Sequence, residues 1–387
     1  MTLLPGVKTL MRLQRVPLGA FRLLCTISPA KVTSICLPRQ LCTNAASGTE
    51  SKPASDPENE SLLESLTFMG VDVKMVRERQ PGVLRKVVTN EQGLAKFLKS
   101  KGSSDKVIAG IISRFPRAIT RSGDHLEQRW ELWRSVFQSD AEIISILDRS
   151  PESFFRSSDN DNLGKNILFL SSLGLTSKHL HRLLTSAPRT FSNSVALNMQ
   201  MVEFLGDVCE ELGGDDPRKF AKDVICRNLY VLIRSTRRVH ANIEMLKSLL
   251  DLSDSEMLDF LQGSGAQILD LSNEYLRNNF MNLQQKLWSC GCREDQFKGM
   301  IVSQPSMLYI GPENLISKID CLLKGGISLK QILEKPRVLE FSKQNITERL
   351  EELHKIGYDF EKSGIGVLNC SRKRFDAKLQ RLPSAQK

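Results

Sequence analysis

The stretch "RSPESFF", residues 149–155, places a proline where the preceding sequence, "AEIISILD", still has the pattern of a helix. A similar break, "RFPRAIT", lies at 114–120, and a third, "SAPRTFS", at 186–192. Proline disfavours helical geometry in the residue before it, and its fixed φ suits the first position of a new helix. Each break therefore predicts that one helix ends and a short one begins.

Alignment on the prolines reveals a repeat. An apolar residue lies three positions after each proline, and two further breaks lack the proline: Leu229 occupies one, and the stretch 263–272 fits the other. The resulting spacing of about 31–41 residues is typical of a solenoid. The prolines and their apolar partners are Pro81 and Leu84, Pro116 and Ile119, Pro151 and Phe154, Pro188 and Phe191, Pro305 and Leu308, and Pro336 and Leu339.

Each unit also has an internal pattern. Before a break, apolar residues recur at offsets that share one helical face, as Ile108, Ile111 and Ile112 do before Pro116. A glycine lies fourteen residues before three of the prolines, where a turn would let an earlier helix end. No strand pattern is present, so we predict an all-α solenoid whose unit is helix, glycine turn, helix and proline break.

These repeats resemble the mitochondrial transcription termination factor family. The segments that carry the resemblance are "RFPRAIT", "RSPESFFR", "SAPRTFSNS", "ILDLSNEY" and "KPRVLEFS", and it covers about residues 65–380. It implies a left-handed superhelix of α-α-3₁₀ repeats that cradles duplex DNA. The chain departs from the family pattern at Leu229 and at 263–266, where the proline is missing.

The two ends of the chain differ from the repeats. Residues 1–49 carry six basic residues and no acidic one, as organelle transit peptides do, so we predict a mitochondrial presequence. The polar stretch 50–64 is predicted to be a disordered linker, and 65–380 the helical repeat domain with a basic C-terminal end. Subtracting the six charges from a net charge of +10 leaves +4, so any nucleic-acid surface depends on where the charge lies.

The sequence contains no catalytic signature. Its five histidines lie outside known hydrolase or metalloprotease motifs, and none of its nine cysteines forms a CxxC pair. We therefore predict no enzyme activity, no metal and no cofactor. No apolar run is long enough to span a membrane, and we expect a monomer.

The basic residues indicate a nucleic-acid surface, since equal repeat offsets align along one edge of a solenoid. Arginine recurs directly after the proline, helix starts after the breaks offer free amides to phosphates, and "SRKRFDAKLQRL" (371–382) is strongly basic. Solvated surface charge is the alternative for each arginine alone. The predicted nucleic-acid contacts, two tyrosines included, are Arg149, Arg156, Ser157, Arg189, Tyr230, Arg234, Ser235, Thr236, Arg237, Arg238, Tyr275, Gly311, Asn314, Lys318, Arg337, Ser342, Lys343, Gln344, Asn345, Ser371, Arg372, Lys373, Arg374 and Lys378.

Two tyrosines fall in or just after the units without proline. Tyr230 and Tyr275 could cap the core with a solvated hydroxyl, or they could stack on an unpaired base. The resemblance favours stacking and adds Arg149 as a third partner, which implies that a base is extruded from the duplex.

The resemblance implies a sequence-specific protein that binds double-stranded mitochondrial DNA in the matrix, at the nucleoid. It implies termination of transcription at the end of the rRNA genes, by obstruction of the polymerase, with the mitochondrial transcription machinery as a potential partner. Two alternatives are an RNA-binding helical array that acts in mitochondrial ribosome assembly and a protein-interaction solenoid. The basic surface disfavours the last.

Overall fold

A computed structural model describes residues 57–381, and within that range the chain is helical without strands. Eight units follow one another, each made of a first helix, a second helix and a short helix, and α20 (Lys343–Lys355), α21 (Phe360–Ser363) and α22 (Arg372–Leu379) complete the C-terminal end. The prediction of an all-α repeat solenoid is confirmed. The predicted presequence, 1–49, lies outside the described residues.

The elements of the eight units fall into three sets. The first helices are α3 (Glu60–Phe68), α5 (Glu91–Ser100), α7 (Gly123–Arg134), α10 (Asn160–Ser172), α12 (Val195–Glu211), α14 (Thr236–Leu250), α16 (Asn273–Ser289) and α18 (Pro312–Lys324). The second helices are α4 (Val73–Arg79), α6 (Asp105–Arg114), α8 (Asp140–Arg149), α11 (Ser177–Ser186), α13 (Pro217–Arg227), α15 (Asp254–Gln262), α17 (Glu294–Ser303) and α19 (Leu329–Glu334). The short helices are η3 (Pro81–Val83), η4 (Pro116–Thr120), α9 (Pro151–Phe155), η5 (Pro188–Phe191), η6 (Leu229–Ile233), η7 (Gly265–Ile268), η8 (Pro305–Tyr309) and η9 (Pro336–Glu340).

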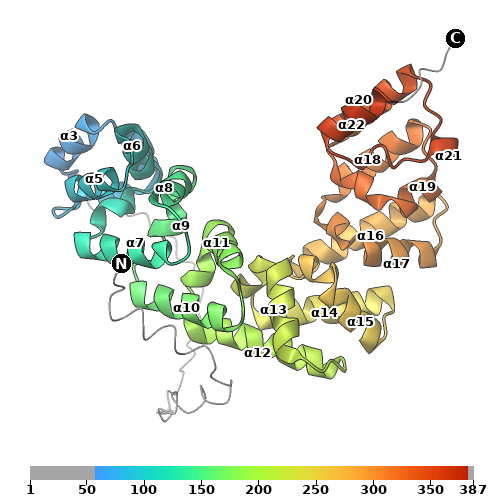
Figure 1. Cartoon of the computed structure of the whole chain (residues 1–387), viewed down its shortest axis with the longest axis horizontal. Coiled ribbons are helices and arrows are strands. Elements are labelled where there is room, and N and C mark those ends of the chain that lie inside the picture. Colours follow the sequence, from blue (N-terminus) through green and yellow to red (C-terminus); the bar gives the residue numbers. More distant parts are fainter. Residues whose placement is uncertain (1–56, 382–387) are drawn as a thin grey trace, which may run out of the picture.

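The units stack side by side into a curved body with two arms (Figure 1). First helices pack on first helices, as α14, α16 and α18 do in turn, and second helices pack on second helices, as α4, α6 and α8 do. The N-terminal arm runs from α3 to α9, the C-terminal arm from α16 to α22, and α10 to α15 join them. One apolar core runs through all units.

The boundary of the repeat region lies earlier than predicted. Helix α3 begins at Glu60 because the Asn59 side chain accepts a hydrogen bond from the Leu62 amide. Leu62 and Leu66 are buried in the core. Residues 60–64, assigned to the linker from their polar composition, are therefore helical.

The proline breaks have the predicted geometry. Helix α6 ends at Arg114, Phe115 takes a non-helical conformation (φ −134°, ψ 74°), and Pro116 opens η4. Ile119 and its counterparts three residues after each proline are buried. At Pro151 the outcome differs in detail, because the short helix α9 is α-helical rather than 3₁₀.

The two units without proline still form short helices. At η6 the side chain of Asn228 accepts a hydrogen bond from the Tyr230 amide at 3.1 Å and so caps the helix that a proline would otherwise begin. At η7 the chain needs Gly265, since a Cβ there would lie 2.4 Å from the Phe260 ring. A side-chain cap thus stands in for proline at η6, and a glycine that lets the chain pass close to Phe260 does so at η7.

A polar residue recurs at the seventh position of five of the first helices and of α20. We call these residues the seventh-position donors: Arg129, Asn166, Asn242, Asn279, Lys318 and Arg349. All are buried, and five donate to backbone carbonyls in or near the break that follows. Arg129 instead donates to Oδ1 of Asn160, the first residue of α10, at 2.9 Å.

The carbonyls that accept these bonds lie where the chain leaves a short helix. Asn279 Nδ2, for example, lies 2.7 Å from the Leu308 carbonyl oxygen and 3.4 Å from that of Ile310. A buried carbonyl without a partner costs free energy. Each donor therefore fixes the segment that leaves the short helix to the helix that carries the donor. In α12 the seventh residue is Met201, and Asn198 bonds to Thr190 and Asn166 instead.

We predict that Asn279→Ala destabilises the protein by about 1–3 kcal/mol, because it leaves buried carbonyls unpaired. The control is Asn278→Ala, which truncates the exposed neighbour on the same helix. Urea unfolding of both variants measures the difference. Equal stability of the two would show that the seventh-position donors do not hold the breaks.

Candidate nucleic-acid interface

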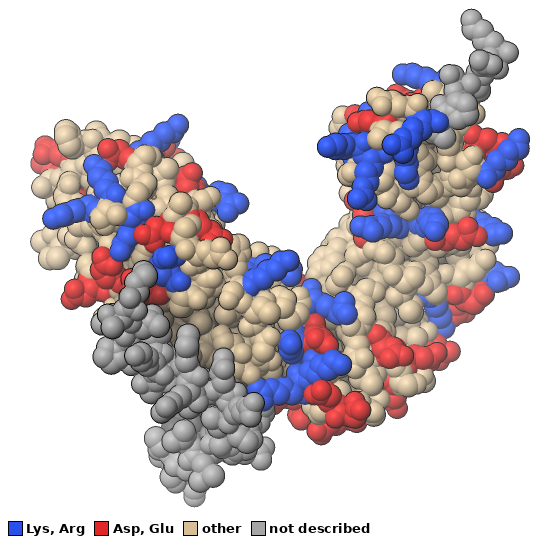
Figure 2. Space-filling view, in the orientation of Figure 1, with Lys and Arg blue, Asp and Glu red and all other residues tan. Residues whose placement is uncertain are grey.

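The space-filling view shows a broad hollow between the two arms (Figure 2). Lys and Arg side chains gather on the part of the C-terminal arm that borders this hollow, and further basic groups lie at the base of that arm. Many Asp and Glu side chains lie instead along the lower outer edge of that arm. Positive and negative side chains are therefore separated on this face of the protein, although the net charge is small.

Four of the predicted arginines near the breaks are exposed, namely Arg149, Arg156, Arg189 and Arg337. Arg149 closes α8, and Arg189 and Arg337 follow Pro188 and Pro336 directly. Arg156 pairs with Glu152, and Arg337 Nε lies 3.7 Å from a Glu340 carboxylate oxygen. Exposed pairs of this kind are weak, so these guanidinium groups can exchange a carboxylate for a phosphate.

The predicted polar residues at the helix starts serve mainly as caps. Ser235 Oγ accepts from the Arg238 amide at 3.3 Å, and Ser342 Oγ accepts from the Asn345 amide at 3.2 Å. Ser157 accepts from the Asp159 amide, and Asp159 itself caps α10. Gly311 and Ser371 occupy the N-cap positions of α18 and α22 without a side-chain bond.

The remaining helix-start residues lie in the first turns of α14, α18 and α20. Thr236, Arg238 and Asn345 are half-buried. Gln344 Nε2 donates to Glu348 at 2.9 Å. The exposed members are Arg237 on α14, Asn314 on α18, and Lys343 and Gln344 on α20.

Lys318 is placed differently from the prediction. It is one of the seventh-position donors, its side chain is 4% exposed, and Nζ donates to the Leu339 carbonyl at 2.9 Å. Burial lowers the pKa of this amine. A residue held in this way supports the backbone of η9 and cannot reach a ligand, so the prediction of a direct contact is wrong for Lys318.

Arg238 and Asn345 are also partly engaged inside the protein. Arg238 Nε and one terminal nitrogen each donate at 2.8 Å to the carbonyls of Leu271 and Asp270, and burial lowers its pKa. Asn345 is half-buried, and its Oδ1 is buried without a partner among the described residues. The Arg238 side chain is thus bonded to the break that follows α14.

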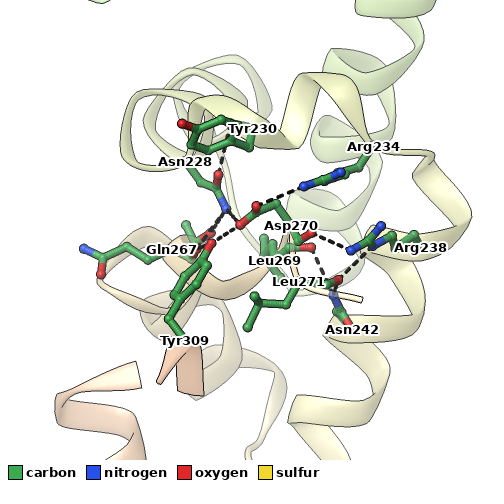
Figure 3. Close-up of polar contacts among 11 residues, drawn as sticks. Asn228, Tyr230, Arg234, Arg238, Asn242, Gln267, Leu269, Asp270, Leu271 and Tyr309 are labelled. Atoms are coloured by element: carbon green, nitrogen blue, oxygen red, sulfur yellow. Dashed lines mark hydrogen bonds and ion pairs between the residues drawn. The ribbon is translucent and has the colours of Figure 1, made fainter. Parts of the chain in front are cut away.

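A buried carboxylate, Asp270, joins the two units that lack proline (Figure 3). Asp270 Oδ1 accepts from Asn228 Nδ2 at 2.9 Å and from the Tyr309 hydroxyl, and Oδ2 lies 3.5 Å from an Arg234 nitrogen. Asn228 Nδ2 also donates to the carbonyls of Ala266 and Gln267 at 3.0 Å. We call Asn228, Arg234, Asp270 and Tyr309 the Asp270 cluster.

The Asp270 cluster ties together the exposed tyrosines. Tyr230 is 40% exposed, Tyr275 36% and Tyr309 41%. The Tyr230 amide bonds to Asn228, and the Tyr275 hydroxyl donates to the Tyr309 carbonyl at 3.0 Å. Both predicted tyrosines are therefore connected to one hydrogen-bonded network. Tyr309, which follows Pro305 by four residues next to a helix start, was not among the predicted contacts.

The basic C-terminal helix, α22, is anchored by a seventh-position donor. Phe375 is fully buried, and the Arg349 guanidinium lies 4.9 Å from its ring centre while donating to the Leu368 and Cys370 carbonyls. Arg372 pairs with Glu352 and Asp376. The helix therefore has a fixed buried side, and its exposed basic residues are Arg372, which is paired, and Lys373, Arg374 and Lys378.

The described residues hold no group of His, Cys, Asp and Glu side chains that could bind a metal. None of the helices in 57–381 is long and apolar enough to cross a membrane. Among the described cysteines, burial raises the pKa of Cys209, Cys226 and Cys292, so these thiols stay protonated. The arrangement suits binding of a polyanion by side chains on a rigid repeat scaffold.

The fold and this surface define an all-α repeat solenoid with basic side chains at regular positions along it. The chain belongs to the mTERF family, whose profile matches residues 61–376. It is 50% identical over 334 residues to Transcription termination factor 1, mitochondrial, of Homo sapiens, which covers 86% of this chain and 83% of that protein.

Two further relatives extend this comparison. Transcription termination factor 1, mitochondrial, of Rattus norvegicus is 52% identical over 329 residues, which is 85% of this chain and 88% of that protein. Transcription termination factor 2, mitochondrial, of Mus musculus is 30% identical over 341 residues, or 88% and 87% of the two chains. The family resemblance found in the sequence is confirmed.

We predict that Asp270→Asn destabilises the protein by about 1.5–3 kcal/mol, the range for a hydrogen bond to a charged group, because its partners face the buried carboxylate. Asp259→Asn, an exposed change on the neighbouring helix α15, serves as the control. Thermal unfolding measures the effect. A loss no larger than that of the control would contradict a structural role for the Asp270 cluster.

Proposed function

We propose that the protein binds a specific site in double-stranded mitochondrial DNA and terminates transcription there by standing in the path of the polymerase. Its relatives at 50% and 52% identity bear the name of mitochondrial transcription termination factors. We place the site at the end of the rRNA genes, the protein in the matrix at the nucleoid, and the presequence in 1–49. We also propose that it acts as a monomer.

The observation that carries the proposal is the exposure of arginines next to the proline breaks. Arg149, Arg189 and Arg337 lie on α8, η5 and η9, all near a proline break and all exposed. Phosphates line a duplex along its length, so guanidinium groups exposed at several units of a solenoid can each contact one. Sequence discrimination requires one or more of these groups to reach a base edge, which a guanidinium can do with two hydrogen bonds to guanine.

Base extrusion is the second part of the proposal. Extrusion of a base costs a few kcal/mol, and stacking on one aromatic side chain returns about 1–3 kcal/mol. Tyr230, Tyr275 and Arg149 together could offset that cost. The Asp270 cluster supports this assignment for Tyr275, because its hydroxyl donates to the Tyr309 carbonyl and a side chain held in this way loses little conformational entropy when it stacks.

The function is tested by selection from random duplexes with the purified protein, followed by transcription across the selected site. We expect one enriched site and shortened transcripts ending at it. A protein that enriches no duplex but binds structured rRNA would instead support the alternative role in ribosome assembly.

Removing charge from α22 tests its binding to phosphates. We predict that Lys373→Ala, Arg374→Ala and Lys378→Ala together weaken binding to specific and random duplexes alike, and lower the salt slope by about 0.9 for each phosphate that the variant no longer neutralises. The matched control removes Lys324, Lys330 and Lys355, which are exposed on the same arm. Equal salt slopes in the two triple variants would remove α22 from the interface.

Substituting the stacking residues tests base extrusion. We predict that Tyr230→Ala, Tyr275→Ala and Arg149→Ala together abolish the rise in 2-aminopurine fluorescence at one position of the cognate site, while random-duplex binding is largely retained. Trp288→Ala, which removes an exposed aromatic ring from α16, is the control. Absence of any fluorescence rise with the unaltered protein would contradict extrusion.

A further inference from the structure

A second basic surface lies at the opposite end of the solenoid from α22. A cavity of about 510 Å³ opens between η3 and η4, and its lining includes Arg79, Gln80, Gly82, Lys86, Arg117 and Thr120. We call it the N-terminal pocket. None of our predicted contacts falls in the units α3 to η4, so this pocket lies outside the interface described above.

The pocket carries three positive charges and, among its lining residues, no carboxylate. Arg79, Lys86 and Arg117 are exposed, and none forms an ion pair with a described residue. Two carboxylates on neighbouring elements are already engaged, Glu58 by Arg77 at 2.7 Å and Asp148 by Arg114 at 3.3 Å. The charges of the pocket are therefore available to an anion from solvent.

The walls of the pocket are fixed by hydrogen bonds. Gln80 Oε1 accepts from the Arg117 amide at 2.9 Å, which ties η3 to η4. An Arg79 terminal nitrogen lies 3.3 Å from the Arg114 carbonyl oxygen, and the Thr120 hydroxyl donates to the Arg117 carbonyl at 2.8 Å. Asn59 Nδ2 donates to the Lys86 carbonyl at 2.8 Å, so the backbone beside all three basic side chains is held while their charges stay unneutralised.

A further cation lies next to Arg117. Arg121 donates to the Phe155 carbonyl at 3.1 Å and is half-buried. Burial, and secondarily the Arg117 charge, lowers the pKa of Arg121. The like charges repel one another, and a bound anion would relieve that repulsion.

The repeat register links the pocket to the predicted DNA contacts. Lys86 follows Pro81 by five residues, and Arg121, Arg156 and Arg234 stand at the same offset in their own units. Arg117 follows Pro116 directly, as Arg189 follows Pro188 and Arg337 follows Pro336. Residues at equal offsets of a solenoid lie along one edge, so the pocket extends the same line of charge into the first two units.

We propose that the N-terminal pocket binds a phosphate of the DNA backbone and sets one end of the bound duplex. The proposal rests on the proposed function and deepens it, because it adds Arg79, Lys86 and Arg117 of the N-terminal arm to the interface. The ligand is a backbone phosphate rather than a base edge, so these residues add affinity without sequence preference.

The test compares the full chain with a variant carrying Arg79→Gln, Lys86→Gln and Arg117→Gln. We expect the hydroxyl-radical footprint on the selected duplex to shorten at one end only, and the salt slope of binding to fall by about 0.9 for each phosphate left without its cation. The matched control, Lys74→Gln, Lys96→Gln and Lys106→Gln, removes three exposed charges from the same units outside the pocket.

Each outcome has a distinct meaning. An unchanged footprint and salt slope in the pocket variant, with tight binding by the unaltered protein, would overturn the pocket alone. Equal reductions in the pocket variant and the control would also overturn it, since general charge would then explain the effect. Absence of duplex binding by the unaltered protein would overturn the proposed function and the pocket with it. Thermal unfolding should change little, because all three substituted side chains are exposed and the one side-chain hydrogen bond lost is the exposed bond from Arg79 to the Arg114 carbonyl.

Discussion

A buried carbonyl must find a donor, and the way this chain meets that requirement determines its architecture. Every proline break exposes backbone oxygens at the point where the chain crosses from one unit to the next. The seventh-position donors reach these oxygens from the first helices and α20, over distances such as 2.6 Å from Arg349 to Leu368 and 3.0 Å from Asn242 to Leu269. Because the same position performs the task in five helices, the crossings there repeat with similar geometry, and so does the stacking of the units.

The identity of the donor varies with what surrounds it. Asparagine suffices where two carbonyls converge, as around Asn279, whereas Arg349 also packs between the rings of Phe341 and Phe375. Burial and the nearby Arg121 charge lower the pKa of Arg129 to about 10, so its guanidinium still carries its charge near neutral pH. Charged donors at both the early and late units therefore serve the scaffold, which explains why a basic residue such as Lys318 is not evidence of a ligand contact.

Proline spacing and apolar periodicity were enough to predict the fold from the sequence, because both act through local backbone geometry. Pro116 and Ile119 predict η4, and Gly102 predicts the turn before α6, where it adopts φ 94°. The buried polar network was not predictable in this way. Asp270 and Asn228 look like ordinary loop residues in the sequence, and only the stacking of distant units shows that they are bonded at 2.9 Å. The exposed arginines were easier to predict than the residues they bond to, since the position of a residue within its repeat follows from the sequence alone.

The reach of these bonds also bears on how the chain folds. The seventh-position bonds join residues only 19 to 31 positions apart, and each unit packs mainly on the units before and after it. Chains dominated by such local contacts fold quickly, because little loop entropy is lost before a contact forms. Assembly can begin in any well-packed pair of units and spread outward in both directions, each new unit using its neighbour as a template. A solenoid held by these hydrogen bonds requires no contact between its two ends. Its two arms can therefore reach their final structure independently of one another.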